Sequence, residues 1–123
     1  MNPTMEKATM SIVEELLEVE NGFERLGLKE EVLAGLKKAG FETPSPIQEE
    51  VIPLILQGSD VIGHAQTGTG KTAAFALPAL HLLENTGATE VLVITPTREL
   101  ASQVSEEISR LGKFLKEIGR AHV

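Results

Sequence analysis

Apolar residues recur at three- and four-residue steps along five segments of this chain, a spacing that gathers side chains on one face of a helix. The first segment lies within residues 1–21, where glutamates fill the other faces and the pattern predicts a short amphipathic helix. Four more helices are predicted, over Lys29–Ala39, from Ser45 to about Leu56, from Ala73 through Leu83, and from Thr97 to Ile118. Pro53 and Pro78 are expected to bend or restart the helices that contain them.

Two shorter apolar runs do not have the helical spacing. Asp60–His64 is brief and leads into a glycine-rich stretch. Val91–Ile94 consists of apolar, mostly β-branched residues without alternating polar positions, which suits a strand buried on both faces of a sheet. The resulting order of strand, helix, strand and helix predicts an α/β fold, with a parallel sheet covered by helices.

Several residues mark where the helices begin and end. Gly40 follows the second predicted helix, where a left-handed cap is wanted, and Phe41 is the apolar residue that often closes such a cap. Ser45 and Gln48 have the spacing of a capping box, with Pro46 at the first helical position. Thr97 is a suitable N-cap for the last helix.

The glycine-rich stretch has the order expected of a phosphate-binding loop, between a strand and a helix. It consists of Ala65, Gln66, Thr67, Gly68, Thr69, Gly70, Lys71 and Thr72. The glycines let backbone N–H groups approach an anion, and the helix that follows adds its positive end. Lys71 can reach the β- and γ-phosphates, and the Thr72 hydroxyl can bind Mg²⁺. The general pattern has glycine where this chain has Ala65, and the alternative is a glycine-rich turn with no ligand.

Composition narrows the kinds of partner. The net charge is −7, which argues against a broad basic face for nucleic acid but allows a site of backbone amides, helix N-termini and one or two arginines. With no tryptophan or tyrosine, a base-stacking platform is not expected. The absence of cysteine excludes disulfides and thiolate metal sites. No apolar run could span a bilayer and no secretory signal is evident, so we expect a cytoplasmic protein.

Three motifs together resemble those of DEAD-box RNA helicases. Gly40–Gln48 resembles the Q motif, with Phe23 as its isolated upstream aromatic residue. The glycine-rich stretch resembles that family's version of the phosphate loop, including alanine at the first position, and Pro96–Ala101 resembles motif Ia. The resemblance implies a P-loop, RecA-like fold with a three-layer parallel sheet and helices on both faces, present only in part. It covers residues 22–123 as the N-terminal portion of the first RecA-like domain, and leaves residues 1–21 as an acidic extension.

The resemblance also implies a role for each motif residue. Phe41 would stack on adenine, Gln48 would meet the N6 donor and N7 acceptor of the base, and Thr43 would add a backbone contact. The capping-box role of Gln48 is compatible with this one, because a capped helix would fix the glutamine. Residues 65–72 would bind ATP, with Lys71 and Thr72 as the catalytic residues and Thr72 as the ligand of Mg²⁺.

Motif Ia would contact the RNA backbone. These contacts would come from Pro96, Thr97, Arg98 and Glu99. An arginine at the positive end of a helix is slightly destabilising because like charges repel. A bound phosphate would make the position favourable, because its negative charge attracts both the arginine and the helix end. Phosphate and sugar contacts carry no sequence information, so RNA binding without sequence specificity is expected.

The implied activity is ATP-dependent unwinding or remodelling of RNA. The Asp-Glu-Ala-Asp and Ser-Ala-Thr motifs of the family and its second domain do not occur in this chain. Phosphoryl transfer needs an acidic residue on Mg²⁺ and a group that positions water, so we expect this chain alone to bind nucleotide without hydrolysing it. The alternatives are a non-catalytic nucleotide-binding or protein-interaction module, whose N-terminal helix engages a partner, and a P-loop ATPase without a role on RNA.

Overall fold

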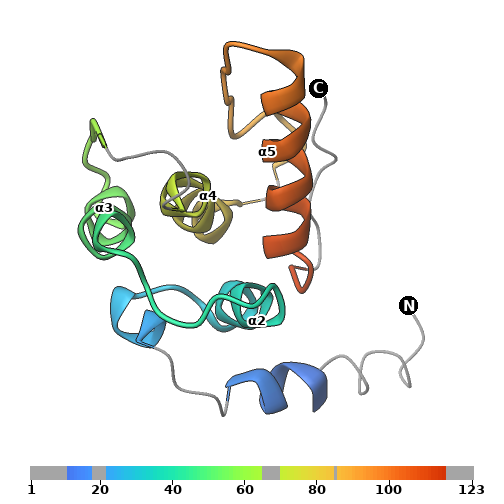
Figure 1. Cartoon of the computed structure of the whole chain (residues 1–123). Helices are drawn as coiled ribbons and strands as arrows, with labels where there is room; N and C mark the ends of the chain where they lie inside the picture. Colours follow the sequence, from blue (N-terminus) through green and yellow to red (C-terminus); the bar gives the residue numbers. More distant parts are fainter. Residues whose placement is uncertain (1–10, 18–21, 65–69, 85, 116–123) are drawn as a thin grey trace.

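The computed structural model describes residues 11–17, 22–64, 70–84 and 86–115. A helical segment at residues 11–17 is followed by one short 3-10 helix and four α-helices (Figure 1). Their bounds are η1 Phe23–Leu26, α2 Glu30–Lys38, α3 Pro46–Leu56, α4 Lys71–Leu82 and α5 Arg98–Leu111. A helix is therefore present within each of the five predicted segments, although the last one ends earlier than predicted.

The helix ends follow the predicted capping chemistry. Gly40 has φ 93°, and two backbone bonds close α2: Gly40 N–H donates to the Lys37 carbonyl and Phe41 N–H to the Leu36 carbonyl. At the start of α3, the Ser45 hydroxyl accepts from Gln48 N–H while the Gln48 side chain accepts from Ser45 N–H, which completes the capping box. Pro53 and Pro78 lie inside helices that continue through them.

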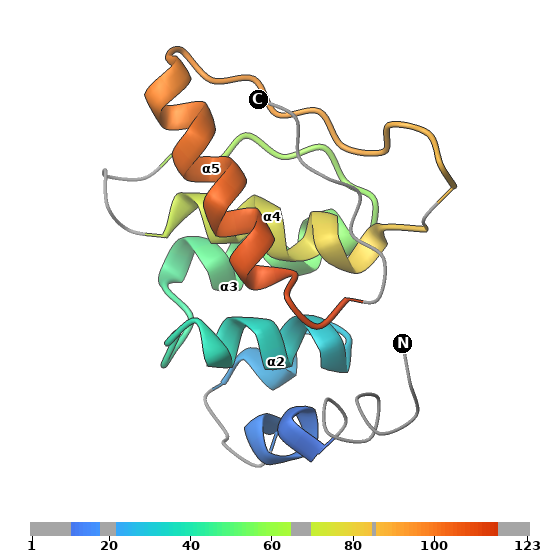
Figure 2. The same ribbon diagram turned by 90° about the vertical axis from the view of Figure 1, so that its right-hand side faces the viewer.

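The helices pack around α4, which lies between α3 and α5, with α2 beneath (Figures 1 and 2). Each contributes the apolar face that its sequence predicted. The largest fully buried side chains are Phe23, Val32, Leu36, Ile52, Leu77, Pro78 and Leu111. The segment at residues 11–17 lies under α2 and buries Val13. No helix in the described ranges combines the length and apolarity that a membrane crossing requires.

The backbones of helices α2 and α5 are in direct contact. A Cβ atom built on Gly35 of α2 would overlap the carbonyl oxygen of Leu111, at the last turn of α5. Leu111 itself is fully buried, so α5 ends against the middle of α2. Any side chain at position 35 would force these two helices apart.

The two predicted strands do not form among the described residues. Residues 60–64 and 91–95 have no regular secondary structure, and Figures 1 and 2 place both on the side of the helices away from α2, with Figure 1 showing them apart. A strand needs a neighbour to pair its N–H and C=O groups, and no described segment supplies one. Their apolar side chains are consequently exposed: Ile62 at 99%, Leu92 at 79% and Ile94 at 86%. The parallel sheet is not confirmed.

The last helix is shorter than predicted. Val104 and Leu111 lie on its apolar face and are buried, but α5 ends at Leu111 with Gly112 as its C-cap. Residues 112–114 form a turn, and Ile118 lies outside the described residues. The apolar spacing predicted a continuation because it does not register the low helix propensity of Gly112, whose N–H donates to the Ile108 carbonyl at the end of the helix.

His81 links the end of α4 to the beginning of α2. Its Nδ1 accepts a 3.0 Å hydrogen bond from the backbone N–H of Lys29, the N-cap residue of α2. This bond requires an unprotonated Nδ1, so the neutral ring carries its proton on Nε2. Burial lowers the pKa of His81 below its ordinary 6.5, and the charge of Lys29 lowers it further.

The lowered pKa makes stability depend on pH. In the unfolded chain His81 regains its ordinary pKa of 6.5, so below that pH the unfolded state binds more protons than the folded state does. The contribution of neutral His81 to the free energy of unfolding should be complete above pH 6.5 and be lost as the pH falls toward the folded-state pKa. Urea unfolding of His81→Gln should show a flatter pH dependence over this window than the parent chain.

His64 provides the matched control, because its side chain is exposed. His64→Gln should keep the pH dependence of the parent chain. Equal pH dependence in the two variants would show that His81 does not couple protonation to folding.

Candidate functional site

The end of the glycine-rich stretch forms the first turn of α4. Ala65, Gln66, Thr67, Gly68 and Thr69 lie outside the described residues. Gly70 is the N-cap of α4, with φ 79°, a conformation that glycine adopts without strain. Lys71 is exposed at the first helical position, and Thr72 follows it, partly buried. The first turn of α4 thus offers free N–H groups, an ammonium and a hydroxyl in one place.

Gln48 ties the first turn of α3 to this turn. The whole residue is only 2% exposed, so a polar side chain lies inside the described core. Oε1 accepts from Ser45 N–H at 2.9 Å, and Nε2 donates to the Gly70 carbonyl at 3.1 Å. The two bonds fix which end of the amide faces which partner. Each end keeps one more hydrogen-bonding position, a lone pair on Oε1 and a hydrogen on Nε2.

Gly70 is closely enclosed by this contact. A Cβ atom at position 70 would overlap Nε2 of Gln48, so glycine is needed here both for its positive φ and for its size. The Gly70 carbonyl also accepts the Ala74 N–H of α4 at 3.2 Å. The predicted adenine-reading residue and the phosphate loop are therefore joined directly.

Phe41 lies partly buried after the cap of α2. Its ring packs edge-to-face on that of Phe23, with centroids 6.3 Å apart and planes at 89°. Phe23 is fully buried, which leaves Phe41 as the outer ring of the pair. The two aromatic residues that the motif comparison singled out are thus in contact. Thr43, the third predicted contact to the base, is exposed.

Motif Ia forms the start of α5. Thr97 is the N-cap, and its hydroxyl oxygen accepts from Leu100 N–H at 3.1 Å, so the hydroxyl hydrogen remains available as a donor. The Thr95 hydroxyl donates to the Thr97 carbonyl at 2.9 Å, which stiffens the approach to the helix. All four residues predicted to contact RNA are exposed: Pro96, Thr97, Arg98 and Glu99.

The two predicted anion sites lie toward the same end of the molecule. The first turns of α4 and α5 both lie on the left in Figure 2. Each helix brings about half a positive charge to its N-terminus, so this end favours anions although the chain has a net charge of −7. Gly70 is joined to the start of α3, so Gln48, the residue predicted to read adenine, belongs to the same end.

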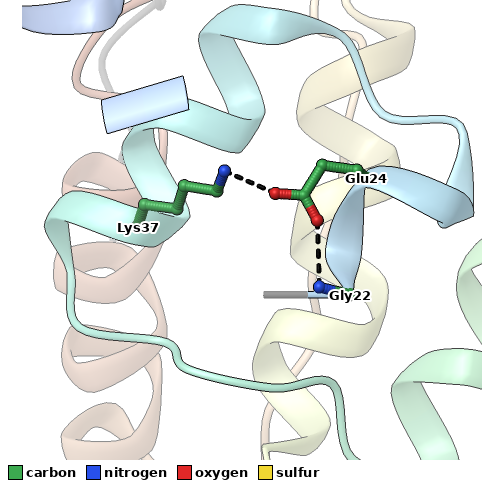
Figure 3. A network of polar contacts seen from close by, with 3 residues as sticks. All are labelled: Gly22, Glu24 and Lys37. Atoms are coloured by element: carbon green, nitrogen blue, oxygen red, sulfur yellow. Dashed lines mark hydrogen bonds and ion pairs between the residues drawn. The ribbon is translucent and has the colours of Figure 1, made fainter. Parts of the chain in front are cut away.

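One polar contact was not anticipated from the sequence. The Nζ atom of Lys37 lies 2.5 Å from Oε1 of Glu24, and the Lys37 side chain is 3% exposed (Figure 3). A lysine in the last turn of α2 suits the negative end of the helix dipole, but this predicts no particular partner. Nothing in the spacing of Glu24 and Lys37 indicated the pair, because it depends on how η1 folds back on α2.

The structure thus joins a capping glutamine, Gln48, to the last glycine of the predicted phosphate-binding loop, Gly70. The family model of the DEAD/DEAH box helicases matches residues 45–122. Helicobacter pylori DEAD-box ATP-dependent RNA helicase RhpA is 65% identical over 94 residues, which cover 76% of this chain and 19% of that protein. ATP-dependent RNA helicase DHH1 of Meyerozyma guilliermondii is 53% identical over 95 residues, covering 76% of this chain and 17% of its own length. The chain belongs to the DEAD/DEAH box helicase family.

Solved structures agree with this assignment. S. cerevisiae Dbp5 bound to RNA and ADP BeF3 superposes with a TM-score of 0.72 at 40% identity, covering 79% of this chain and 26% of that one. A DEAD box protein from Methanococcus jannaschii gives a TM-score of 0.75 at 41% identity, covering 79% and 27%. The RecA-like fold expected from the motifs is therefore supported. The chain spans less than a fifth of the length of the two relatives above.

Proposed function

We propose that this chain is the nucleotide-binding and RNA-contacting portion of a DEAD-box ATP-dependent RNA helicase, which remodels RNA duplexes without reading their sequence. The bond from Gln48 Nε2 to the Gly70 carbonyl carries this proposal, because it joins an adenine-reading amide to a phosphate loop. A glutamine needed only for its helix cap would have no reason to reach Gly70. By itself, the chain binds nucleotide but does not hydrolyse it.

ATP would lie across the first turns of α3 and α4. Phe41 would cover one face of adenine, and the remaining lone pair and hydrogen of Gln48 would accept from N6 and donate to N7 of the base. Guanine does not present the same pair of hydrogen-bonding groups, a donor and an acceptor, so ATP is preferred to GTP. Thr43 would add a backbone contact, and residues 65–72 would surround the phosphates, with Lys71 neutralising the β- and γ-phosphates.

Mg²⁺ fits the donors that this chain offers. In the described ranges no three histidine, aspartate or glutamate residues gather into a metal site. Mg²⁺ in nucleotide sites takes few protein oxygens and completes its shell with phosphate oxygens and water. The Thr72 hydroxyl is the oxygen on this chain that would hold it, beside the phosphates bound by Lys71. The ion would neutralise the charge that develops on the phosphates.

RNA would bind across the start of α5. Arg98, the hydroxyl hydrogen of Thr97 and the first N–H groups of the helix can all meet one phosphate. Pro96 and Glu99 would order the backbone around it.

Residues 60–64 and 91–94 would be strands of a parallel sheet, and their exposed apolar side chains support this, because such side chains would be covered in a complete sheet. A cytoplasmic location remains part of this proposal.

Arg98→Ala tests the RNA half of the proposal. The arginine is exposed, so its truncation should cost the fold little. Loss of a charged hydrogen bond to phosphate should weaken binding of a mixed-sequence single-stranded RNA about tenfold and reduce the salt slope by about 1. Fluorescence anisotropy at several salt concentrations measures both quantities.

Arg110→Ala is the control, because Arg110 is exposed on the same helix but in its last turn. It removes the same charge without touching motif Ia. If both variants weaken RNA binding equally, the arginines act only through net charge and the α5 N-terminus is not the contact.

A further inference from the structure

The Glu24–Lys37 pair is unusual because its lysine is buried. Lys37 is in the last turn of α2, and its side chain is 3% exposed, whereas the neighbouring Lys38 is exposed. Taking an ammonium out of water is costly, and a nearby carboxylate compensates only in good geometry. Here Oε1 of Glu24 stands 2.5 Å from Nζ, and Nζ has no other polar partner among the described residues. A solvated lysine at this position would stabilise the end of α2 equally well. We therefore look for a role of the ion pair outside this helix.

Glu24 connects this lysine to the start of η1. Its second oxygen, Oε2, accepts the Gly22 N–H at 2.9 Å (Figure 3). The carboxylate therefore fixes the turn from which Phe23 projects into the core. Gly22 in turn lies against the Q motif, since a Cβ atom built on it would stand 3.2 Å from Cδ of Pro44. One carboxylate thus holds the turn that supports both Phe23 and the loop before α3.

Lys37 also contacts the Q motif, through its backbone. Its backbone carbonyl accepts the Gly40 N–H at 3.0 Å, in the cap that leads directly into Phe41. The Phe41 ring then packs edge-to-face on Phe23. Phe41 is therefore held at its backbone by the end of α2 and at its ring by η1, and the ion pair fastens these two elements to each other.

We propose that Glu24 and Lys37 are positioning residues for adenine binding: they lock η1 onto α2 so that Phe23 holds the Phe41 ring ready to stack on the base. The inference rests on the proposed function, in which Phe41 meets adenine. Neither residue touches the nucleotide. Their contribution is to keep the Phe41 ring in one orientation before ADP or ATP arrives, so that less conformational freedom is lost on binding.

Lys37→Met tests this inference. Methionine keeps the apolar stem in place, and Glu24 is partly exposed, so its carboxylate can be solvated. Titration calorimetry of the 123-residue chain should show ADP binding weakened about three- to tenfold, the range of an aromatic contact, with inorganic tripolyphosphate bound as in the parent chain. Lys37→Arg, which can still pair with Glu24, should restore ADP affinity, and Lys38→Met should leave both affinities unchanged.

A second measurement needs no nucleotide. The NMR shifts of the Phe41 ring protons report on the edge-to-face contact with Phe23, so they should move in Lys37→Met and stay in Lys38→Met. If Lys37→Met changes neither the Phe41 ring shifts nor the ADP affinity, the inference is wrong, while the proposed function is unaffected. An equal loss of ADP and tripolyphosphate binding would also overturn the inference, since the pair would then only support the fold. If the parent chain binds ADP no more tightly than tripolyphosphate, the adenine site itself fails, and the proposed function with it.

Discussion

Replacing Gly35 with alanine is expected to destabilise the protein by about 2–3 kcal/mol, although alanine is the better helix former by about 1 kcal/mol. A Cβ atom at this position would overlap the backbone carbonyl of Leu111, and backbone atoms cannot turn aside as a flexible side chain can. Helix α5 would have to move away from α2, opening the buried contacts of Leu111. Urea unfolding followed by the circular dichroism of the helices measures the loss.

Gly58→Ala separates this effect from a general cost of adding a methyl group. Gly58 has φ 90°, and a Cβ atom there would meet nothing within 4 Å. Its substitution should cost only about 1–2 kcal/mol, through the strained backbone angle. A Gly35→Ala chain as stable as the parent would show that α2 and α5 do not touch at backbone distance.

Replacing Gln48 with alanine should remove the preference for adenine. The substitution deletes the group proposed to meet N6 and N7 of the base, and it also breaks the bond from Nε2 to the Gly70 carbonyl. Affinity for Mg²⁺–ADP should fall by about ten- to hundredfold, toward that for Mg²⁺–GDP, since buried hydrogen bonds of this kind contribute about 1–3 kcal/mol. Calorimetric titration with the two nucleotides measures the change directly.

Ser45→Ala is the matched control, because it damages the cap without removing the amide. The hydroxyl that accepts from Gln48 N–H is lost, while the Ser45 backbone N–H that holds Gln48 Oε1 remains. This variant should lose about 1 kcal/mol of stability and keep its preference for ADP over GDP. Loss of the preference in both variants would mean that the glutamine acts through the helix cap and does not read the base.

The helices were predictable because their signals are local. Gly40 after α2, Ser45 and Gln48 around the start of α3, and Thr97 before α5 each act within one helical turn. Apolar spacing then placed Val32, Leu36, Ile52 and Leu77 in the core. Local chemistry also located the predicted site, since each motif sits at a helix end whose geometry depends on its own residues.

Other features depend on contacts between distant segments, which periodicity cannot reveal. The predicted strand Val91–Ile94 pairs with nothing in the described ranges, because backbone pairing depends on neighbours and not on the run itself. The approach of Gly35 to Leu111 joins residues 76 positions apart (111 − 35), and the Glu24–Lys37 pair depends on the fold of η1. The bond from Gln48 to Gly70 likewise became visible only when α3 and α4 were placed together.

We propose that a single site, built by α3 and α4, binds an adenine nucleotide. The most direct test is calorimetric titration of the 123-residue chain with Mg²⁺–ADP and, separately, with Mg²⁺–GDP. We expect one binding site per chain and an ADP affinity at least about tenfold higher than that for GDP. Equal affinity for the two nucleotides, or no binding of either, would contradict it.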